Sequence, residues 1–325
     1  LMKTKLIKKF DKPPPKAFNN EYPTSHYQFK NPMLMMVCGV RNSGKGYTTS
    51  KIIRDANSEN LYDVVYMITP TFQSNRAQFG DLGIVEENVY YPTKDCVEKV
   101  IERVEQDRDD WEEYLIEMEI YENWIAKTNT SKAIHTITDD DVEEFVSAGY
   151  ITLEGDIIEG MKMPEWKYPT IRKPQSLLVL DDVLGSGALN HSAGLTKLAI
   201  MNRHIAPLTG EEGGSLGLSV IIQTQTYCTT QGVSRAIREN LTELVLFNQK
   251  GDKVIDKIVQ EMGGAVDPDE FRQAYEYALK EKHDNLTVSF NPKCGTLRYR
   301  KNLNELIMFE EALKECQCKK KAKVK

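Results

Sequence analysis

A seven-residue loop between a strand and a helix constrains this chain more than any other feature. Residues Met33–Val40 are almost all apolar over the length of a strand, and Gly44–Asp55 has a helix-compatible composition. Residues Gly39–Lys45 join them with the sequence GVRNSGK, which has the spacing GxxxxGK. In this context the spacing is typical of a loop that offers backbone N–H groups and a lysine to phosphate oxygens. The sequence therefore predicts a phosphate-binding loop.

Seven residues of this loop and of the helix start are expected to bind the nucleotide cofactor. They are Gly39, Asn42, Ser43, Gly44, Lys45, Gly46 and Tyr47. Lys45 would place its positive charge near the β and γ phosphates, and the glycines would let the backbone approach closely.

Gly46 stands where such a loop usually carries the Ser or Thr hydroxyl that binds Mg²⁺. Thr48 points to a different face of the predicted helix, whereas Thr49 shares the face of Gly46 but starts about 4.5 Å farther along the axis. Two interpretations stay open. Either a water molecule fills the ligand position, or the chain binds nucleotide with weakened Mg²⁺ coupling and slow hydrolysis.

A second apolar run ends in two carboxylates. Leu177–Asp182 has the sequence LLVLDD, as expected of a buried Walker B strand that delivers acids to the phosphate end of a sheet. In this interpretation Asp181 holds Mg²⁺, and Asp182 orients or deprotonates the attacking water. The alternative is a strand that runs into an acidic turn, which the following Gly185–Gly187 segment favours.

A third apolar run, Leu218–Gln225, ends in two glutamines. An amide both donates and accepts hydrogen bonds, so a glutamine at a strand end can contact a phosphate oxygen or the attacking water. Gln225 is the preferred candidate for this role and Gln223 the second. Polar residues also end many strands that bind nothing.

Strands and helices alternate along most of the chain, which predicts an α/β fold with a mostly parallel sheet flanked by helices. Strands are expected at Met33–Val40, Asp63–Ile68, Asn88–Tyr91, Ser176–Val183, Leu218–Thr224 and Glu243–Asn248, with helices over Gly44–Asp55, Gly194–His204 and Ser234–Asn240. Two helices near Lys253–Met262 and Pro268–Lys282, a hairpin of Leu286–Phe290 and Gly295–Arg300, and a closing helix over Asn304–Leu313 should follow.

Residues 93–172 interrupt this pattern as a helical insertion between the second strand region and the Walker B strand. One long amphipathic helix, or two, is expected over Thr93–Lys127, and a short helix over Asp139–Ala148. The acidic face is interpreted as a solvated surface, with an oligomer contact as the alternative. The domain prediction is an arm at 1–30, one domain at 31–315 with the insertion, and a basic tail at 316–325.

Charge and cysteine usage narrow the class of protein further. The formal net charge of −6 and a pI near 5.6 restrict any nucleic-acid contact to a local basic path. The six cysteines form no CxxC pair, which favours a reducing compartment and no metal site. The chain also lacks a signal-peptide core and an apolar run of about 18 residues, so a soluble intracellular protein is expected.

Five segments occur in an order that resembles a known family: GVRNSGK, LLVLDD, MNRH, SVIIQTQTY and AIRENLTELVLF. Together they are similar to the motif set of the poxvirus, giant-virus and virophage DNA-packaging ATPases, in the FtsK-HerA superfamily of P-loop NTPases. The resemblance implies an ATPase that uses ATP and Mg²⁺ to translocate double-stranded DNA into a viral capsid. It also implies that Lys45 binds phosphate, Asp181 serves Mg²⁺, Asp182 is the catalytic acid/base and Gln225 is the sensor.

The same resemblance places an arginine finger at Arg203, which would reach the nucleotide of a neighbouring subunit. The alternative is a cation at a helix C-terminus, where the helix dipole favours it. A finger that acts in trans implies a homo-oligomeric ring, a pentamer or hexamer, with DNA in its centre. Arg235 and Arg238 are expected on one helix face, either to signal between subunits or as solvated residues.

Further partners implied by the resemblance are capsid or portal-like vertex proteins, in the host cytoplasm at a virus factory or in the virion. Segments Gly185–Asn190 and Thr209–Gly217 are candidate pore loops that would contact DNA phosphates. Two alternative functions stay open. One is an assembly or export factor of the filamentous-phage type, and the other is a nucleotide-binding scaffold with weak hydrolysis.

Overall fold

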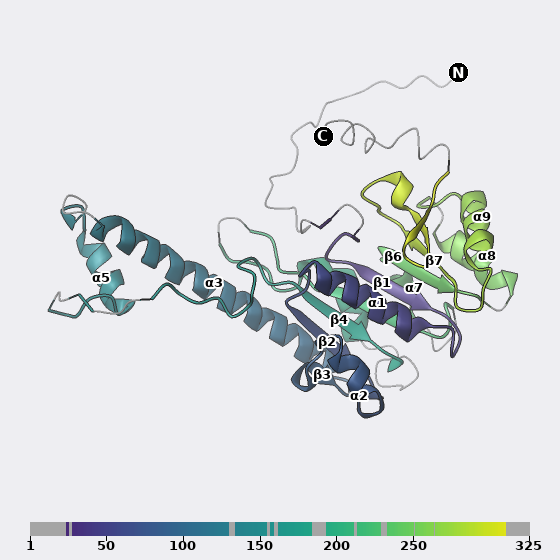
Figure 1. Ribbon diagram of the computed structural model, residues 1–325, viewed down its shortest axis with the longest axis horizontal. Coiled ribbons are helices and arrows are strands. Elements are labelled where there is room, and N and C mark those ends of the chain that lie inside the picture. Colours follow the sequence, from purple (N-terminus) through teal and green to yellow (C-terminus); the bar gives the residue numbers. More distant parts are fainter. Residues whose placement is uncertain are drawn as a thin grey trace, which may run out of the picture.

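The chain forms a nine-stranded sheet with helices on both faces (Figure 1). The computed structural model describes residues 24–25, 28–129, 134–154, 157–158, 162–183, 193–210, 213–228, 233–249, 251–262 and 264–309. The strand order is β3-β2-β4-β5-β1-β6-β7-β8-β9. The strands are β1 (Leu34–Cys38), β2 (Val64–Ile68), β3 (Val89–Tyr90), β4 (Ser176–Leu180), β5 (Ser219–Thr224), β6 (Glu243–Phe247), β7 (Asn285–Ser289), β8 (Tyr299–Lys301) and β9 (Glu305–Ile307).

The strands from β3 to β6 in this order pair in parallel, and β7, β8 and β9 extend the sheet with antiparallel pairs. Strand β5 lies between β1 and β4, with Met36 opposite Ile222 and Leu178 opposite Val220. The predicted fold class, a mostly parallel α/β sheet flanked by helices, is confirmed.

Helices connect the parallel strands and cover both faces of the sheet. They are α1 (Lys45–Ser58), α2 (Phe72–Gly80), α3 (Cys96–Thr128), α5 (Asp139–Ser147), α6 (Ala193–Met201), α7 (Arg235–Glu239), α8 (Asp252–Glu261) and α9 (Pro268–Ala278), with short 3₁₀ turns η2 (Glu86–Asn88), η4 (Asn202–His204) and η5 (Gly295–Leu297). Helices α1 and α2 pack on one face, and α3, α6, α7, α8 and α9 contribute to the core on the other.

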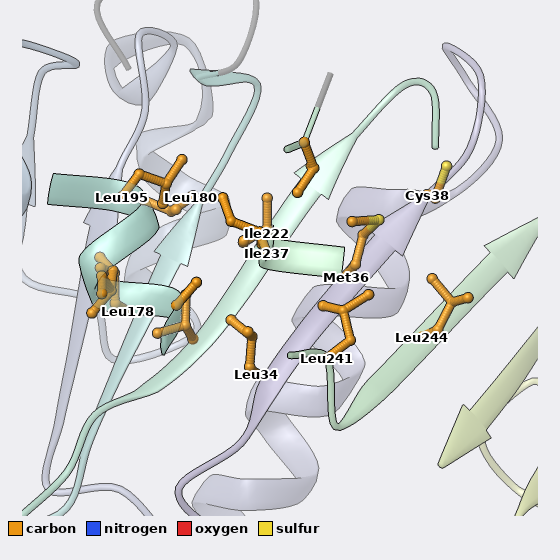
Figure 2. Close-up of a cluster of buried hydrophobic side chains, with 14 of the residues drawn as sticks. Leu34, Met36, Cys38, Leu178, Leu180, Leu195, Ile222, Ile237, Leu241 and Leu244 are labelled. Carbon is orange, nitrogen blue, oxygen red and sulfur yellow. The ribbon is translucent and has the colours of Figure 1, made fainter. Parts of the chain in front are cut away.

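The sheet is buried on both faces, which explains why its strands are continuously apolar. In β1, Leu34, Met36 and Cys38 point into the larger core cluster, whereas Met35 and Val37 point into the second. Figure 2 shows the larger cluster, where side chains from β1, β4, β5 and β6 meet those of α6 and α7. Each fully buried aliphatic side chain contributes about 1.5–3 kcal/mol to stability.

The insertion after β3 projects away from the sheet (Figure 1). Helix α3 is one continuous helix of 33 residues, and α5 packs near its far end. Trp124, Phe145, Tyr150 and Ile151 form a separate small core there, and Thr138 starts α5 with a reciprocal capping box to Asp141. Among the described helices, none combines the length and the hydrophobicity that a membrane span requires.

The predicted closing helix over Asn304–Leu313 is wrong where the structure describes it. Residues Glu305–Ile307 form β9, which pairs with β8, so their backbone groups are satisfied by the sheet rather than by a helix. The Tyr277 hydroxyl also donates a hydrogen bond of 2.5 Å to Glu305 Oε1. The predicted hairpin is present, but its second strand is only Tyr299–Lys301. Residues 1–23 and the basic tail lie outside the described residues.

Candidate functional site

The carboxyl ends of three neighbouring parallel strands meet at one edge of the sheet. Strand β1 leads into the loop at Gly39, β4 leads into Asp181, and β5 leads into Gln225. The pairing of Cys38 with Thr224, and of Leu180 with Ile222, aligns these ends. They surround a cavity of about 540 Å³ that is lined by residues 41–46, Asp181, Asp182, Gln223 and Gln225. Residues far apart in sequence are thus brought to one site.

The loop depends on two backbone features. Gly44 has φ 109°, a left-handed conformation that glycine adopts readily, and it caps the N-terminus of α1. A Cβ atom at Gly39 would lie 2.5 Å from Ser43 Oγ and 2.7 Å from Phe247 Cβ, so the loop backbone packs tightly on the end of β6. Lys45 Nζ donates to the carbonyl oxygens of Gly39 at 2.7 Å and Val40 at 3.1 Å.

The two carboxylates have different surroundings. The Thr69 hydroxyl, at the end of β2, donates to Asp181 Oδ2 at 3.0 Å. Asp182 has φ 53°, a left-handed conformation that Asp and Asn adopt more readily than most residues. The Gln225 amide donates to Asp182 Oδ1 at 3.3 Å. Hydrogen bonds therefore link the ends of β2, β4 and β5 around the cavity.

Burial and neighbouring groups have opposing effects on the pKa values of Lys45 and Asp181. Burial lowers the pKa of Lys45, while the charges of Asp182, Cys38 and Asp181 raise it. Burial raises the pKa of Asp181, and the charge of Asp182 adds to this increase, whereas the Thr69 hydrogen bond and the charge of Lys45 reduce it. One cation thus faces two carboxylates in a partly desolvated cavity, where a phosphate with a divalent cation would complement the charges.

A divalent cation would have to be held mainly by oxygen atoms. Among the described residues, no group of three His, Cys, Asp or Glu side chains forms a complete metal site. Asp181 and the Thr69 hydroxyl lie together, and Thr49 of α1 is among the residues that line the cavity. Thr49 is 3% exposed, and its oxygen has no hydrogen-bond partner among the described residues. These oxygens fit Mg²⁺, which usually combines one or two carboxylates with phosphate and water.

Gly46 leaves the usual position of the metal-binding hydroxyl open. A Cβ atom there would meet nothing within 4 Å. Gly46, Thr49 and Ser50 nevertheless line the cavity together, because positions three and four apart share one helix face. Two of the predicted residues do not line this cavity: Gly39 packs on β6, and Tyr47 is 71% exposed and lines a neighbouring cavity.

Arg203 does not join the cavity of its own chain. It lies in η4, where the Leu218 N–H donates to Asn202 O at 2.7 Å and the Ser215 hydroxyl donates to Arg203 O at 2.8 Å. Leu218 precedes β5, so η4 lies at the amino ends of the parallel strands, opposite the phosphate loop. Arg203 is therefore separated from the site by about the length of strand β5.

Arg238 has a structural role that the sequence did not indicate. The expectation of a solvated side chain is wrong, because Arg238 is 8% exposed, whereas a signal between subunits stays a prediction. Its guanidinium makes two hydrogen bonds of 2.7 Å to Glu261 and lies over the Tyr227 ring. Arg235 is exposed and pairs with Glu239 at 2.7 Å. Helix spacing alone could not separate these two arginines.

Three features of the site carry no sequence motif. Thr69 follows an apolar strand just as Asp181 does, and this position was the one available indication of its role. The importance of Thr49 depends on its burial without a partner. His283 Nδ1 lies 3.2 Å from Ser43 O, in a segment that carries no motif. The candidate pore loop Gly185–Asn190 lies outside the described residues.

The strand order, the loop and the acidic strand end define a P-loop NTPase fold, with one strand between the loop strand and the acidic strand. No protein-family model and no curated protein sequence matches the chain. Solved structures of similar fold include the genome packaging NTPase B204 from Sulfolobus turreted icosahedral virus 2 in complex with ATP-gammaS. The identity is 11%, the alignment covers 83% of this chain and 97% of that chain, and the TM-score is 0.39.

Two further solved structures match this chain with similar sequence identities and TM-scores. EssC (ATPases 2 and 3) from Geobacillus thermodenitrificans is 12% identical, with 87% of this chain and 42% of that chain covered and a TM-score of 0.40. The pCW3 conjugation coupling protein TcpA is 10% identical, with 88% and 66% covered and a TM-score of 0.40. Because these TM-scores are below 0.5, the class assignment rests on the strand order and the loop.

The tight packing at Gly39 predicts a specific loss of stability. Gly39→Ala should lower the free energy of unfolding by about 1–3 kcal/mol, because the new methyl group overlaps Ser43 and Phe247. Gly46→Ala is the matched control, with open space around its new Cβ atom; because Gly46 lies in the first turn of α1, the change should raise stability by no more than the roughly 0.5–1 kcal/mol of a helix-interior Gly→Ala change. Urea unfolding of both variants measures the difference. Equal effects would contradict the packing argument.

Proposed function

We propose that this chain is a Mg²⁺-dependent ATPase that translocates double-stranded DNA, in the packaging of a viral genome. The observation that carries the enzymatic part is the arrangement of Lys45, Asp181, Asp182 and Gln225 around one cavity at the strand ends. The loop supplies backbone N–H groups for phosphate, and the strand ends supply the polar groups that hydrolysis requires. The DNA part rests on the motif order in the sequence.

Each group has a distinct task in the proposed reaction. Lys45 and the loop N–H groups hold the phosphates, and Asp181 with the Thr49 and Thr69 hydroxyls would hold the cation. When bound, Mg²⁺ neutralises charge on the phosphate oxygens. Asp182 accepts a proton from the water that attacks the γ-phosphorus, and the bond to the bridging oxygen of ADP breaks. Gln225, hydrogen-bonded to Asp182, orients this water.

The charge distribution disfavours DNA contact on the insertion. Residues 93–172 carry 21 acidic and nine basic residues, a net charge of −12. The remaining residues carry 27 acidic and 33 basic residues, a net charge of +6. The acidity of the whole chain is thus concentrated in the insertion, which would repel DNA phosphates. Residues 1–30 and 316–325 together carry 12 basic and two acidic residues, so the positive excess lies in these two segments, and any basic path on the domain itself must be local.

Arg203 is assigned to the neighbouring subunit's site. Its place at the amino ends of the strands keeps it from the nucleotide of its own chain. In a head-to-tail ring, the same place can face the phosphate loop of the next subunit, where a guanidinium would stabilise charge on the transferred phosphoryl group. The proposal therefore includes a homo-oligomeric ring with shared active sites.

Loss of either central charge should abolish catalysis. Lys45→Ala and Asp182→Asn are each expected to lower the rate of DNA-stimulated ATP hydrolysis by about 100-fold or more. Asparagine tolerates the left-handed backbone at position 182, so this variant should keep its fold. Phosphate release with and without double-stranded DNA is the measurement. Lys99→Ala and Asp109→Asn on α3 are matched controls, and unchanged hydrolysis in the first two variants would refute the site assignment.

A shared site predicts complementation between two inactive variants. Arg203→Ala and Lys45→Ala should each be inactive alone, the first for lack of the finger and the second for lack of phosphate binding. Mixed rings contain some interfaces in which an intact loop faces an intact Arg203, so a mixture should recover part of the ATPase rate. Native mass spectrometry with a nonhydrolysable ATP analogue confirms mixing. Mixed rings without recovered activity would contradict the role in trans.

The open position at Gly46 predicts a gain of cation coupling. Gly46→Thr should fold normally and should increase the effect of Mg²⁺ on the affinity for a nonhydrolysable ATP analogue about tenfold, because a hydroxyl reaches the usual ligand position. Calorimetric titration with Mg²⁺ and with EDTA measures this effect without hydrolysis. Gly46→Val is the control of similar shape. A threonine variant that behaves like the valine variant would favour the scaffold with weak hydrolysis.

A further inference from the structure

A second cavity of about 760 Å³ lies directly beside the phosphate loop. It shares Asn42 and Gly44 with the first cavity, and its outer walls are Tyr47 and Lys51 on one side and residues 281–285 on the other. No sequence motif marks this region. The cavity nevertheless follows from the sheet topology, as the antiparallel strands show.

Strand β7 runs antiparallel to β6, so it begins where β6 ends, with Asn285 opposite Phe247. Strand β8 runs antiparallel to β7 and ends at the same edge, with Lys301 opposite Leu286. The turns before β7 and after β8 are therefore brought to the edge that carries the phosphate loop. His283 in the first turn approaches the loop, with Nδ1 3.2 Å from Ser43 O.

Helix α1 separates the two cavities. Gly46, Thr49 and Ser50 line the first cavity, whereas Tyr47 and Lys51 line the second. The two sets lie on different sides of the helix because each contains positions three or four residues apart. The phosphate loop at the N-terminus of α1 is open to both cavities, so a ligand held on the loop can extend into either.

The position of the catalytic groups fixes the direction in which a nucleotide must lie. Asp181, Asp182 and Gln225 are at the ends of β4 and β5, on one side of the loop, and mark where the γ-phosphate would be. The α-phosphate and the nucleoside must then lie on the other side, toward β6 and β7. The second cavity is on that side. The apolar end of the first cavity, at Met67 and Phe79, lies beyond the carboxylates.

We infer that the second cavity binds the nucleobase and ribose of the nucleotide, with the base stacked on the Tyr47 ring; this inference rests on the proposed function. The ring is 71% exposed in the chain alone, and stacking would remove part of its face from water. Lys51, His283 and Asn302 line the same cavity with polar side chains. The ligand class is therefore a nucleoside triphosphate that spans both cavities.

The far wall of the cavity is preformed by a hydrogen-bond network. Asp284 accepts hydrogen bonds from Asn302 Nδ2 at 2.7 Å and from the Glu281 N–H at 3.1 Å, and it pairs with Lys301 at 3.0 Å. Lys51 Nζ donates to Asn302 O at 3.2 Å, which ties this wall to α1. Binding a base therefore requires little ordering of the protein, which favours affinity.

The experiment compares ligands with and without a nucleoside. Calorimetry should show that Tyr47→Ala raises the Kd for a nonhydrolysable ATP analogue about tenfold, equivalent to about 1.4 kcal/mol, because a stacking surface is lost. The Kd for inorganic tripolyphosphate, which lacks base and ribose, should stay within twofold of the wild-type value. Tyr47→Phe keeps the aromatic face and should bind the analogue like the wild type. Tyr91→Ala removes a tyrosine of similar exposure, 68%, beside β3 at the opposite end of the sheet, and should change neither Kd.

The outcomes separate this inference from the proposed function. Tripolyphosphate binding with an analogue Kd that Tyr47→Ala leaves unchanged would overturn the base site alone. Equal weakening of both ligands would also overturn it, because Tyr47 would then act on the loop rather than on a base. A wild-type chain that binds neither ligand would overturn the proposed function and the base site with it. Weaker analogue binding in Phe79→Ala, with no effect in Tyr47→Ala, would place the base in the first cavity.

Discussion

The parallel ladder of β1, β5 and β4 is the constraint on which every other feature depends. It aligns Cys38, Thr224 and Leu180 near one edge, so the chain segments that follow them must meet. A shift of one residue in this register would exchange the two buried faces of a strand and would also move its polar end. Apolar burial on both faces excludes this shift, because Leu34 and Met35 fill different core clusters. The same packing that stabilises the fold therefore positions the site.

Much of the fold could be predicted because parallel strands buried on both faces are continuously apolar. The runs before Gly39, Asp181 and Gln225 each gave a strand, and each strand end carried polar residues with a recognisable chemistry. The long helix of the insertion could be predicted from its apolar spacing, and its small core at Trp124 and Phe145 explains how an arm remote from the sheet stays ordered. Local sequence patterns were sufficient to predict a helix or strand wherever that element buries an apolar face of its own.

Sequence patterns did not predict the structure where a contact with a residue distant in sequence determines it. Residues Glu305–Ile307 resemble the start of a helix, yet β8 offers a ladder of hydrogen bonds that local sequence does not reveal. Arg238 has the spacing of an exposed helix residue, yet Glu261 and Tyr227 bury it in an ion pair and a ring contact. The Thr69 contact to Asp181 spans 112 residues, and no motif links the two positions. In each case tertiary contacts override a local preference.

Helix α1 shows how one short sequence serves two cavities. Near its N-terminus, the side toward the carboxylates carries Gly46, Thr49 and Ser50, small residues that leave room for phosphate and a cation, whereas the other side carries Thr48 and the long side chains of Tyr47 and Lys51. Lys51 donates a hydrogen bond to Asn302 O, whereas the largely exposed Tyr47 has no packing explanation within the chain. It has one if a triphosphate lies across the helix N-terminus with its phosphates on the small-residue side. Strands more than 100 residues away determine which side of α1 faces the carboxylates and which faces the second cavity. The difference between the two sides is therefore visible only in the folded chain.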